Sequence, residues 1–292
     1  MSRTIAIFGP GLLGGSLLMA LRARLPQTRL HVWARRVESL EPIHQQGLAD
    51  VASTDPGTVA KGADLVVLCT PVGAMPALAQ SFLPSLKPET IVTDVGSVKA
   101  SIHRQMAPLA EGRFRWLGSH PMAGAEKMGV AAARADLFVG AVGVVTPTRK
   151  SNPGAVRIVE QLWKSVGARL LTLTPKAHDA LVSRSSHLPH VVAAQLANLV
   201  LSPGHSKEQG LLCANGFRDT TRIASGSPEM WRDIALANRK NLSQALEAFT
   251  DGLLDFKRAL ENGDAQAVAK FFEQARERRD LWSKRAGSPS PE

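Results

Sequence analysis

The chain has 292 residues, of which 44% are hydrophobic and 21% are charged, a composition typical of a soluble globular protein large enough for two domains. Its net charge is +10, but the arginines are scattered and no aromatic side chains interleave with them, so a nucleic-acid-binding surface is not expected. The chain contains no tyrosine, which excludes the short-chain dehydrogenases because those enzymes need a catalytic Tyr beside a Lys.

The apolar runs and the two cysteines indicate where in the cell the protein is located and whether it binds a metal ion. No apolar segment is long enough to span a bilayer, and the first apolar run is too short for a signal peptide. Cys69 and Cys213 lie in apolar or mixed segments and form no metal-ligand cluster. We therefore expect a cytoplasmic protein with reduced cysteines, no metal ion and no membrane partner.

The first part of the chain alternates short apolar runs with amphipathic stretches, which is typical of a doubly wound, mostly parallel sheet. Strands are predicted at Thr4–Phe8, Leu30–Ala34, Asp64–Cys69, Thr90–Asp94, Arg115–Gly118, Gly143–Thr146 and Arg169–Leu173. Helices are predicted at Leu12–Arg24, Val37–Gln46, Met75–Leu83, after Ser97, and at Pro153–Ser165.

The pattern changes after Thr174, where strand-like runs largely vanish and a helical period takes over. Its clearest helices are predicted at Ala177–Val200, Met230–Leu260 and Ala265–Trp282. We predict an α/β domain over residues 1–174, an all-helical domain over 175–286 and a disordered tail over 287–292. Because such a helical domain often buries its apolar faces against a twin, a homodimer is expected.

A glycine-rich turn follows the first predicted strand and opens the first helix. Gly9, Gly11 and Gly14 form a G-x-G-x-x-G pattern in which Leu12 and Leu13 are the variable positions. The glycines permit a tight turn, close approach of a pyrophosphate and close helix–strand packing. The pattern in this context predicts a Rossmann-type dinucleotide site at the N-terminus of the helix.

Two further positions are assigned to that cofactor site. Thr70 and Pro71 directly follow the predicted strand Asp64–Cys69. Parallel strands direct their carboxyl ends toward such a ligand.

The end of the second strand bears on the choice of cofactor. NAD enzymes place an Asp or Glu there, whereas this chain has Arg35 and Arg36 and no carboxylate before Glu38. Two guanidinium groups suit the 2′-phosphate of NADP, so NADP is preferred over NAD. The alternative is that both arginines are only solvated at a helix start.

His120 lies at the end of a predicted buried strand, far downstream of the glycine turn. A neutral imidazole can take a proton from an alcohol while a nicotinamide takes its hydride. The pairing of this histidine with a dinucleotide site therefore indicates a dehydrogenase.

Several longer segments sharpen this assignment. They are Thr93–Lys99, Ser119–Gly124, Ser185–His190, Gly216–Ala224 and Ser227–Ile234, followed by Asn238. With the glycine turn, and in this order from Ile5 to about Asn241, they resemble the prephenate and arogenate dehydrogenase family of tyrosine biosynthesis. The resemblance implies NAD(P)-dependent oxidative decarboxylation of a cyclohexadienol, prephenate and/or arogenate, to 4-hydroxyphenylpyruvate or tyrosine.

The resemblance also implies roles for individual residues. His120 is the base, and Ser97 hydrogen-bonds the substrate hydroxyl and that histidine. Arg222 binds a substrate carboxylate. The other residues assigned to the substrate pocket are Ser186, His190, Gly216, Trp231 and Glu126. Ala125 stands where relatives often carry Thr, so one pocket hydroxyl is missing.

Some of these residues have simpler interpretations. Ser97 could be a helix N-cap, and His187 or His190 could be a packed helix residue. Trp231 could belong to the core. Two other functions stay open. A hydroxyacid or 6-phosphogluconate type of dehydrogenase would use Lys240 beside Asn238 or Asn241, and a redox sensor would bind NADP without turnover.

Overall fold

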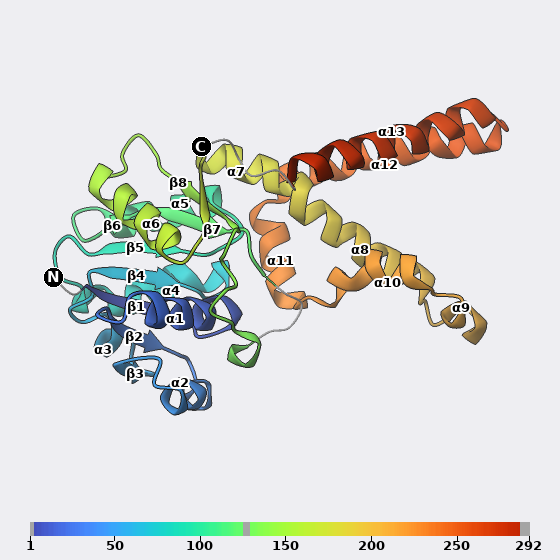
Figure 1. Ribbon diagram of the computed structural model, residues 1–292. Helices are drawn as coiled ribbons and strands as arrows, with labels where there is room; N and C mark the ends of the chain where they lie inside the picture. The colour runs from blue at the N-terminus through green and yellow to red at the C-terminus, as the bar shows by residue number, and fades with distance from the viewer. Residues whose placement is uncertain (1–2, 125–128, 287–292) are drawn as a thin grey trace. The chain divides into compact units, whose positions relative to one another are not determined.

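The structure is a computed structural model that describes residues 3–124 and 129–286 (Figure 1). Six parallel strands form the first sheet, in the order β3-β2-β1-β4-β5-β6. Their bounds are β1 Thr4–Phe8, β2 Arg29–Trp33, β3 Val51–Ser53, β4 Leu65–Leu68, β5 Ile91–Asp94 and β6 Arg115–Trp116. The strand order reverses between β1 and β4, which is where such sheets bind ligands at their carboxyl ends.

Helices connect these strands and cover both faces of the sheet. They are α1 Leu12–Arg24, η1 Val37–Ser39, α2 Glu41–Gln45, α3 Pro56–Ala60, η2 Val72–Ala74, α4 Met75–Phe82, η3 Leu83–Ser85 and α5 Ala100–Ala110. In β1, Ile5 and Ile7 face one apolar cluster while Ala6 and Phe8 face the other.

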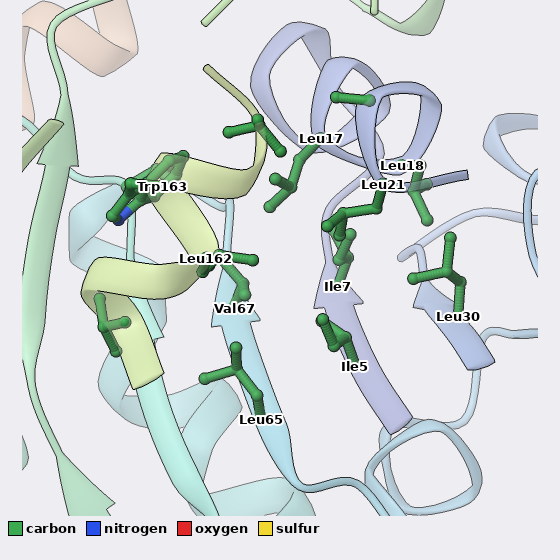
Figure 2. Packing of buried hydrophobic residues seen from close by; sticks show 14 of the residues in the cluster. Ile5, Ile7, Leu17, Leu18, Leu21, Leu30, Leu65, Val67, Leu162 and Trp163 are labelled. Atoms are coloured by element: carbon green, nitrogen blue, oxygen red, sulfur yellow. The ribbon is translucent and has the colours of Figure 1, made fainter. Parts of the chain in front are cut away.

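Figure 2 shows the first of these clusters, in which Ile5 and Ile7 of β1 lie below Leu17 and Leu21 of α1, and to which Leu162 and Trp163 also belong. The core therefore lies on both faces of the sheet. It fixes the position of β1, and with it the glycine turn that follows the carboxyl end of this strand.

A second sheet of three strands follows, in the order β7-β8-β9. Its elements are β7 Gly118–Pro121, η4 Val130–Ala132, β8 Val142–Thr146, α6 Pro153–Ser165 and β9 Arg169–Thr172. Strand β7 pairs with β8 in antiparallel fashion and β8 pairs with β9 in parallel. The alternating pattern predicts that these strands extend the parallel sheet, but β7, β8 and β9 form a separate sheet and β6 alone is added to the first.

The remaining elements are helical, in agreement with the predicted change after Thr174. They are α7 Pro175–Val182, the π-helix η5 Ser183–His187, α8 Leu188–Val200, α9 Lys207–Leu211, α10 Asn215–Thr221, η6 Arg222–Ser225, α11 Pro228–Ala237, α12 Arg239–Glu261 and α13 Ala265–Ala286. The fold class is confirmed: an α/β domain with a parallel sheet precedes a helical region.

The chain forms two compact units, residues 1–241 and 242–292. In the second unit, α13 folds back on α12, and Phe256 packs against Phe271 with ring centroids 4.5 Å apart. The predicted boundary after residue 174 lies within the first unit and stays a prediction. The predicted tail over 287–292 lies outside the described residues.

A buried histidine outside the candidate site links α5 to both sheets. His103 accepts a hydrogen bond at Nδ1 from the Trp116 indole (3.2 Å), and its Nε2 lies 3.3 Å from the Thr146 hydroxyl. That hydroxyl donates to the Gly118 carbonyl, so Nε2 donates to Thr146 and the ring is neutral. Burial lowers the pKa of His103 to about 4.

We expect this histidine to make the fold acid-sensitive. Between pH 6.5 and 4 the unfolded chain binds a proton at residue 103 that the folded chain does not, so stability falls as the pH falls through this window. The slope from this group is at most about 1.4 kcal/mol per pH unit. Urea unfolding of His103→Gln at pH 7.5, 6 and 5 should show a shallower dependence than the unsubstituted chain, and equal slopes would contradict this assignment.

Candidate active site

The glycine turn has the shape that a dinucleotide requires. Gly9 has φ +103°, a left-handed conformation that other residues rarely adopt. A Cβ on Gly14 would lie 2.1 Å from the Gly9 carbonyl oxygen, whereas a Cβ on Gly11 would meet nothing within 4 Å. Gly14 is therefore needed for close packing, and Gly11 leaves space beside the turn.

The surroundings of the turn suit phosphate and ribose groups. Leu12 and Leu13 open α1, where backbone N–H groups have no intrahelical partner, and the first turn holds no acidic side chain. The buried Thr70 hydroxyl, just after β4 and before Pro71, has no hydrogen-bond partner among the described residues. These observations fit a dinucleotide at the carboxyl ends of β1 and β4.

Arg35 and Arg36 follow β2, and both side chains are exposed. Arg36 precedes the short helix η1, whose first turn carries Glu38. No acidic residue stands directly at the strand end, as the sequence indicated.

His120 lies inside β7, opposite Val144 of β8, rather than after a strand of the parallel sheet. Its Nδ1 is 2.9 Å from Nε2 of His178, and Nδ1 of His178 is 2.8 Å from the Asp179 carboxylate. A carboxylate only accepts, so His178 carries its hydrogen on Nδ1 and accepts at Nε2. His120 then donates from Nδ1, and its Nε2 is left as an acceptor.

Asp179 also binds the start of α5. Its Oδ1 accepts from the Lys99 backbone N–H (2.7 Å) and its Oδ2 from that of Ala100 (2.9 Å). The N-cap position of α5 is Lys99, so Ser97 is not the N-cap, and the carboxylate from α7 satisfies the helix end instead.

Ser97 lies in the loop between β5 and α5 and is half-buried. No hydrogen bond of its hydroxyl, to His120 or to another described group, is present in the described part of the chain. Its backbone lies against His187 and favours the protonated form of that ring. The expected contact between Ser97 and His120 stays a prediction.

A buried ion pair supports the strand that carries His120. The Lys99 ammonium donates to the Asp94 carboxylate and to the Ser119 carbonyl (2.7 Å). Asp94 in turn accepts from the Ser119 backbone N–H (3.1 Å). Both charged side chains are fully buried, so they hold β5, α5 and β7 in one arrangement.

A π-helix interrupts the expected helix Ala177–Val200. The Asn238 amide donates to the Asp179 carbonyl (2.9 Å) and also lies 3.2 Å from Nδ1 of His187. Asn238 is thus buried in the framework while Lys240 is exposed, which argues against the lysine–asparagine alternative.

His190 and Trp231 form one wall next to this π-helix. Their rings stack with centroids 3.7 Å apart, and His187 meets the same indole edge-on at 6.1 Å. Nδ1 of His190 donates to the Ser186 carbonyl (2.9 Å), so its Nε2 is an acceptor. The structure therefore brings together three of the residues predicted for the substrate pocket.

Arg222 opens η6, and Gly216 lies in α10; both residues are exposed, and both elements pack against α8. A Cβ at Gly226, directly after η6, would lie 2.6 Å from Nε1 of Trp231. The segment that carries Arg222 therefore ends against the Trp231 wall. Glu126, also predicted for the pocket, lies outside the described residues.

Burial disfavours the charged form of three histidines of the site, His120, His187 and His190. Burial holds the pKa of His120 well below its ordinary value, and His178, Lys99 and His187 nearby add to this effect. Burial also lowers the pKa of His187 to about 4 and lowers that of His190. A neutral imidazole is the form that accepts a proton.

The pair His178 and Asp179 was not predicted from the sequence. The two residues are adjacent at the start of a predicted helix, and both are almost fully buried. The only local signal is a histidine beside an aspartate on an otherwise amphipathic helix, which is too weak to assign a role.

Within residues 3–124 and 129–286, no group of three or more His, Cys, Asp or Glu side chains is arranged to hold a metal ion. No helix in those ranges is long and apolar enough to cross a membrane.

Comparisons with known proteins agree over nearly the whole chain. Residues 19–172 match the family model described as the prephenate dehydrogenase nucleotide-binding domain, and residues 174–274 match that of the prephenate dehydrogenase dimerization domain. Prephenate dehydrogenase of Bacillus subtilis (strain 168) is 33% identical, over 96% of this chain and 76% of that protein. Cyclohexadienyl dehydrogenase of Zymomonas mobilis is 31% identical, over 94% of each chain.

Among solved structures, prephenate dehydrogenase from A. aeolicus, in complex with hydroxyphenyl propionate and NAD+, gives a TM-score of 0.89 at 29% identity. The match covers 96% of this chain and 98% of that one.

The two glycines of the turn should respond differently to the same substitution. Gly11→Ala should keep its melting temperature but raise the dissociation constant for the cofactor at least about tenfold, since the new methyl occupies space open to the pyrophosphate. Gly14→Ala should lower the melting temperature, because its Cβ collides with the Gly9 carbonyl. Calorimetry and cofactor titration measure both, and equal effects on melting would contradict this geometry.

Proposed function

The chain belongs to the prephenate dehydrogenase family, and from that premise we propose how its own residues perform the reaction. It has prephenate or cyclohexadienyl dehydrogenase activity in tyrosine biosynthesis, an NAD(P)-dependent oxidation. The family reaction removes a hydride from a carbinol carbon and carbon dioxide from the same ring, which becomes aromatic.

His120 is the base that takes the proton of the carbinol hydroxyl. The observation that carries this role is the hydrogen-bond chain from Asp179 through His178, which leaves Nε2 of His120 as an acceptor. As hydride departs, the hydroxyl becomes strongly acidic, and a neutral imidazole within hydrogen-bonding distance lowers the barrier. Ser97, in the loop before α5, orients the same hydroxyl.

Arg222 anchors a carboxylate of the substrate. A guanidinium group makes two charge-assisted hydrogen bonds to a carboxylate and so fixes the ring in one orientation. The stacked His190 and Trp231 next to this segment form an apolar and aromatic wall for the cyclohexadiene. Ser186, Gly216 and Glu126 complete the proposed pocket.

The nucleotide-binding domain binds NADP in preference to NAD. Gly9, Gly11, Leu12, Leu13 and Gly14 hold the pyrophosphate, and Thr70 and Pro71 lie beside the nicotinamide end. When bound, the cofactor supplies the hydride acceptor. Arg35 and Arg36, exposed at the end of β2, grip the 2′-phosphate.

The assembly is a homodimer formed through the helical region. The matched dimerization domain supports this, as do the apolar side chains that α12 and α13 expose. Among these, Leu253 is 48% exposed and Phe272 is 59% exposed, and several large exposed apolar side chains on one pair of helices are typical of an interface with another protein.

Initial rates with prephenate or arogenate, each with NAD and with NADP, test the substrate and cofactor together. Turnover of either substrate with either cofactor is the expected result. If the protein binds the cofactor but turns over neither substrate, a non-catalytic redox sensor would be favoured instead.

Cofactor choice should depend on the two arginines. The ratio of kcat/KM for NADP over NAD should exceed one and should fall at least about tenfold in the double variant Arg35→Ala, Arg36→Ala, since each lost charged hydrogen bond costs about 1.5–3 kcal/mol. Arg113→Ala changes an exposed arginine in the turn after the C-terminal end of α5 and should leave the ratio unchanged. A preference for NAD in the unsubstituted protein would overturn the proposal.

His120→Asn should lower kcat at least about 100-fold, the usual contribution of a general base. Cofactor affinity should stay the same, because the glycine turn is untouched. His103→Gln is the matched control, since it changes a buried histidine outside the site, and it should keep its turnover at pH 7.5. Near-normal turnover of His120→Asn would remove His120 as the base.

A further inference from the structure

The family reaction has a proton balance that the site must meet. The hydroxyl hydrogen leaves the carbinol oxygen as hydride departs to the nicotinamide. When the bond to the ring carboxylate breaks, its electron pair enters the ring and the oxygen becomes a phenolate. That oxygen then takes a proton, so the proton removed at the start is needed again at the end.

We propose that the buried pair His178 and Asp179 stores this proton during turnover. Nε2 of His120 binds the hydroxyl proton while the Nδ1 proton of His120 passes to Nε2 of His178, across the 2.9 Å hydrogen bond. The positive charge then lies on His178, directly against the Asp179 carboxylate, and His120 is neutral again. Both transfers reverse to protonate the phenolate oxygen. This inference rests on the proposed role of His120.

Because both side chains of the pair are buried, a proton on them is kept from exchanging with solvent. His178 is 0% exposed and Asp179 is 2% exposed, so the proton on them is shielded from solvent. Asp179 has no freedom to turn away, because the backbone N–H groups of Lys99 and Ala100 hold its oxygens at 2.7 and 2.9 Å. The charged intermediate therefore keeps its geometry until the phenolate forms.

The other charges around the pair favour this position. Burial disfavours a cation on His120 most strongly, and Lys99, the N-cap residue of α5, and His187 of the π-helix add to this effect. Asp94 of β5 pairs with Lys99 and partly compensates its charge. Moving the charge from His120 to His178 places it beside a carboxylate instead.

The variant His178→Gln tests proton storage by residue 178 separately from its role in orienting the His120 ring. A glutamine can accept from Nδ1 of His120 and donate to Asp179, so it keeps the hydrogen-bond chain, but it cannot hold a proton. We expect kcat to fall at least about tenfold with the KM for substrate changed less than about threefold.

The comparison series contains His120→Asn, His178→Gln and Asp179→Asn, with His103→Gln as the control. Asp179→Asn leaves His178 without its carboxylate and should likewise lower kcat more than it raises KM, and it serves as the second variant if His178→Gln fails to fold. Normal kcat in His178→Gln, or a rise in KM as large as the loss of kcat, overturns proton storage. If His120→Asn keeps turnover, the proposed base itself is wrong.

Discussion

The Asp179 carboxylate is the interaction on which the geometry of the site depends. It accepts hydrogen bonds from two backbone N–H groups at the start of α5 and from the ring of His178. A carboxylate is favoured at a helix N-terminus by the unsatisfied N–H groups and by the helix dipole. The same bonds that satisfy the helix end therefore fix the tautomer of His178 and, through it, that of His120.

The buried pair of Lys99 and Asp94 completes this framework at an energetic cost. Removing two charges from water costs several kcal/mol per ion, and apolar residues of the same volume would be about as stable. The pair instead fixes the position of β7, because both side chains also bind the backbone of Ser119, the residue before His120. A closed circuit of hydrogen bonds thus links β5, α5, α7 and β7.

Much of this fold could be predicted from local pattern. Buried parallel strands read as apolar runs, and α1 and α6 were predicted with the bounds that the structure has, Leu12–Arg24 and Pro153–Ser165. The short β3, Val51–Ser53, was missed because it is only half-buried. Strand β7 was missed because its residues favour turns, and its pairing with β8 is a tertiary contact.

The candidate site was predictable only where its residues belong to recognisable segments. His120, Arg222 and the glycine turn were assigned to the candidate site in this way. The contact between His120 and His178 joins residues 58 positions apart, and that between Lys99 and Asp179 joins residues 80 apart. Local periodicity carries no information on such pairs, so the network behind His120 emerges only from the folded chain.

The π-helix at Ser183–His187 limits how the chain can vary in length. Its i→i+5 hydrogen bonds already accommodate one residue more than a regular α-turn holds. One further residue inserted here would turn everything that follows by roughly 100°, the rotation per residue of an α-helix. Asp179 would keep its place while the ring of His190 left the face of Trp231. Point substitutions can be absorbed locally in this segment, whereas a further insertion would separate the two halves of the site, so the segment should not be longer in any functional descendant of this sequence.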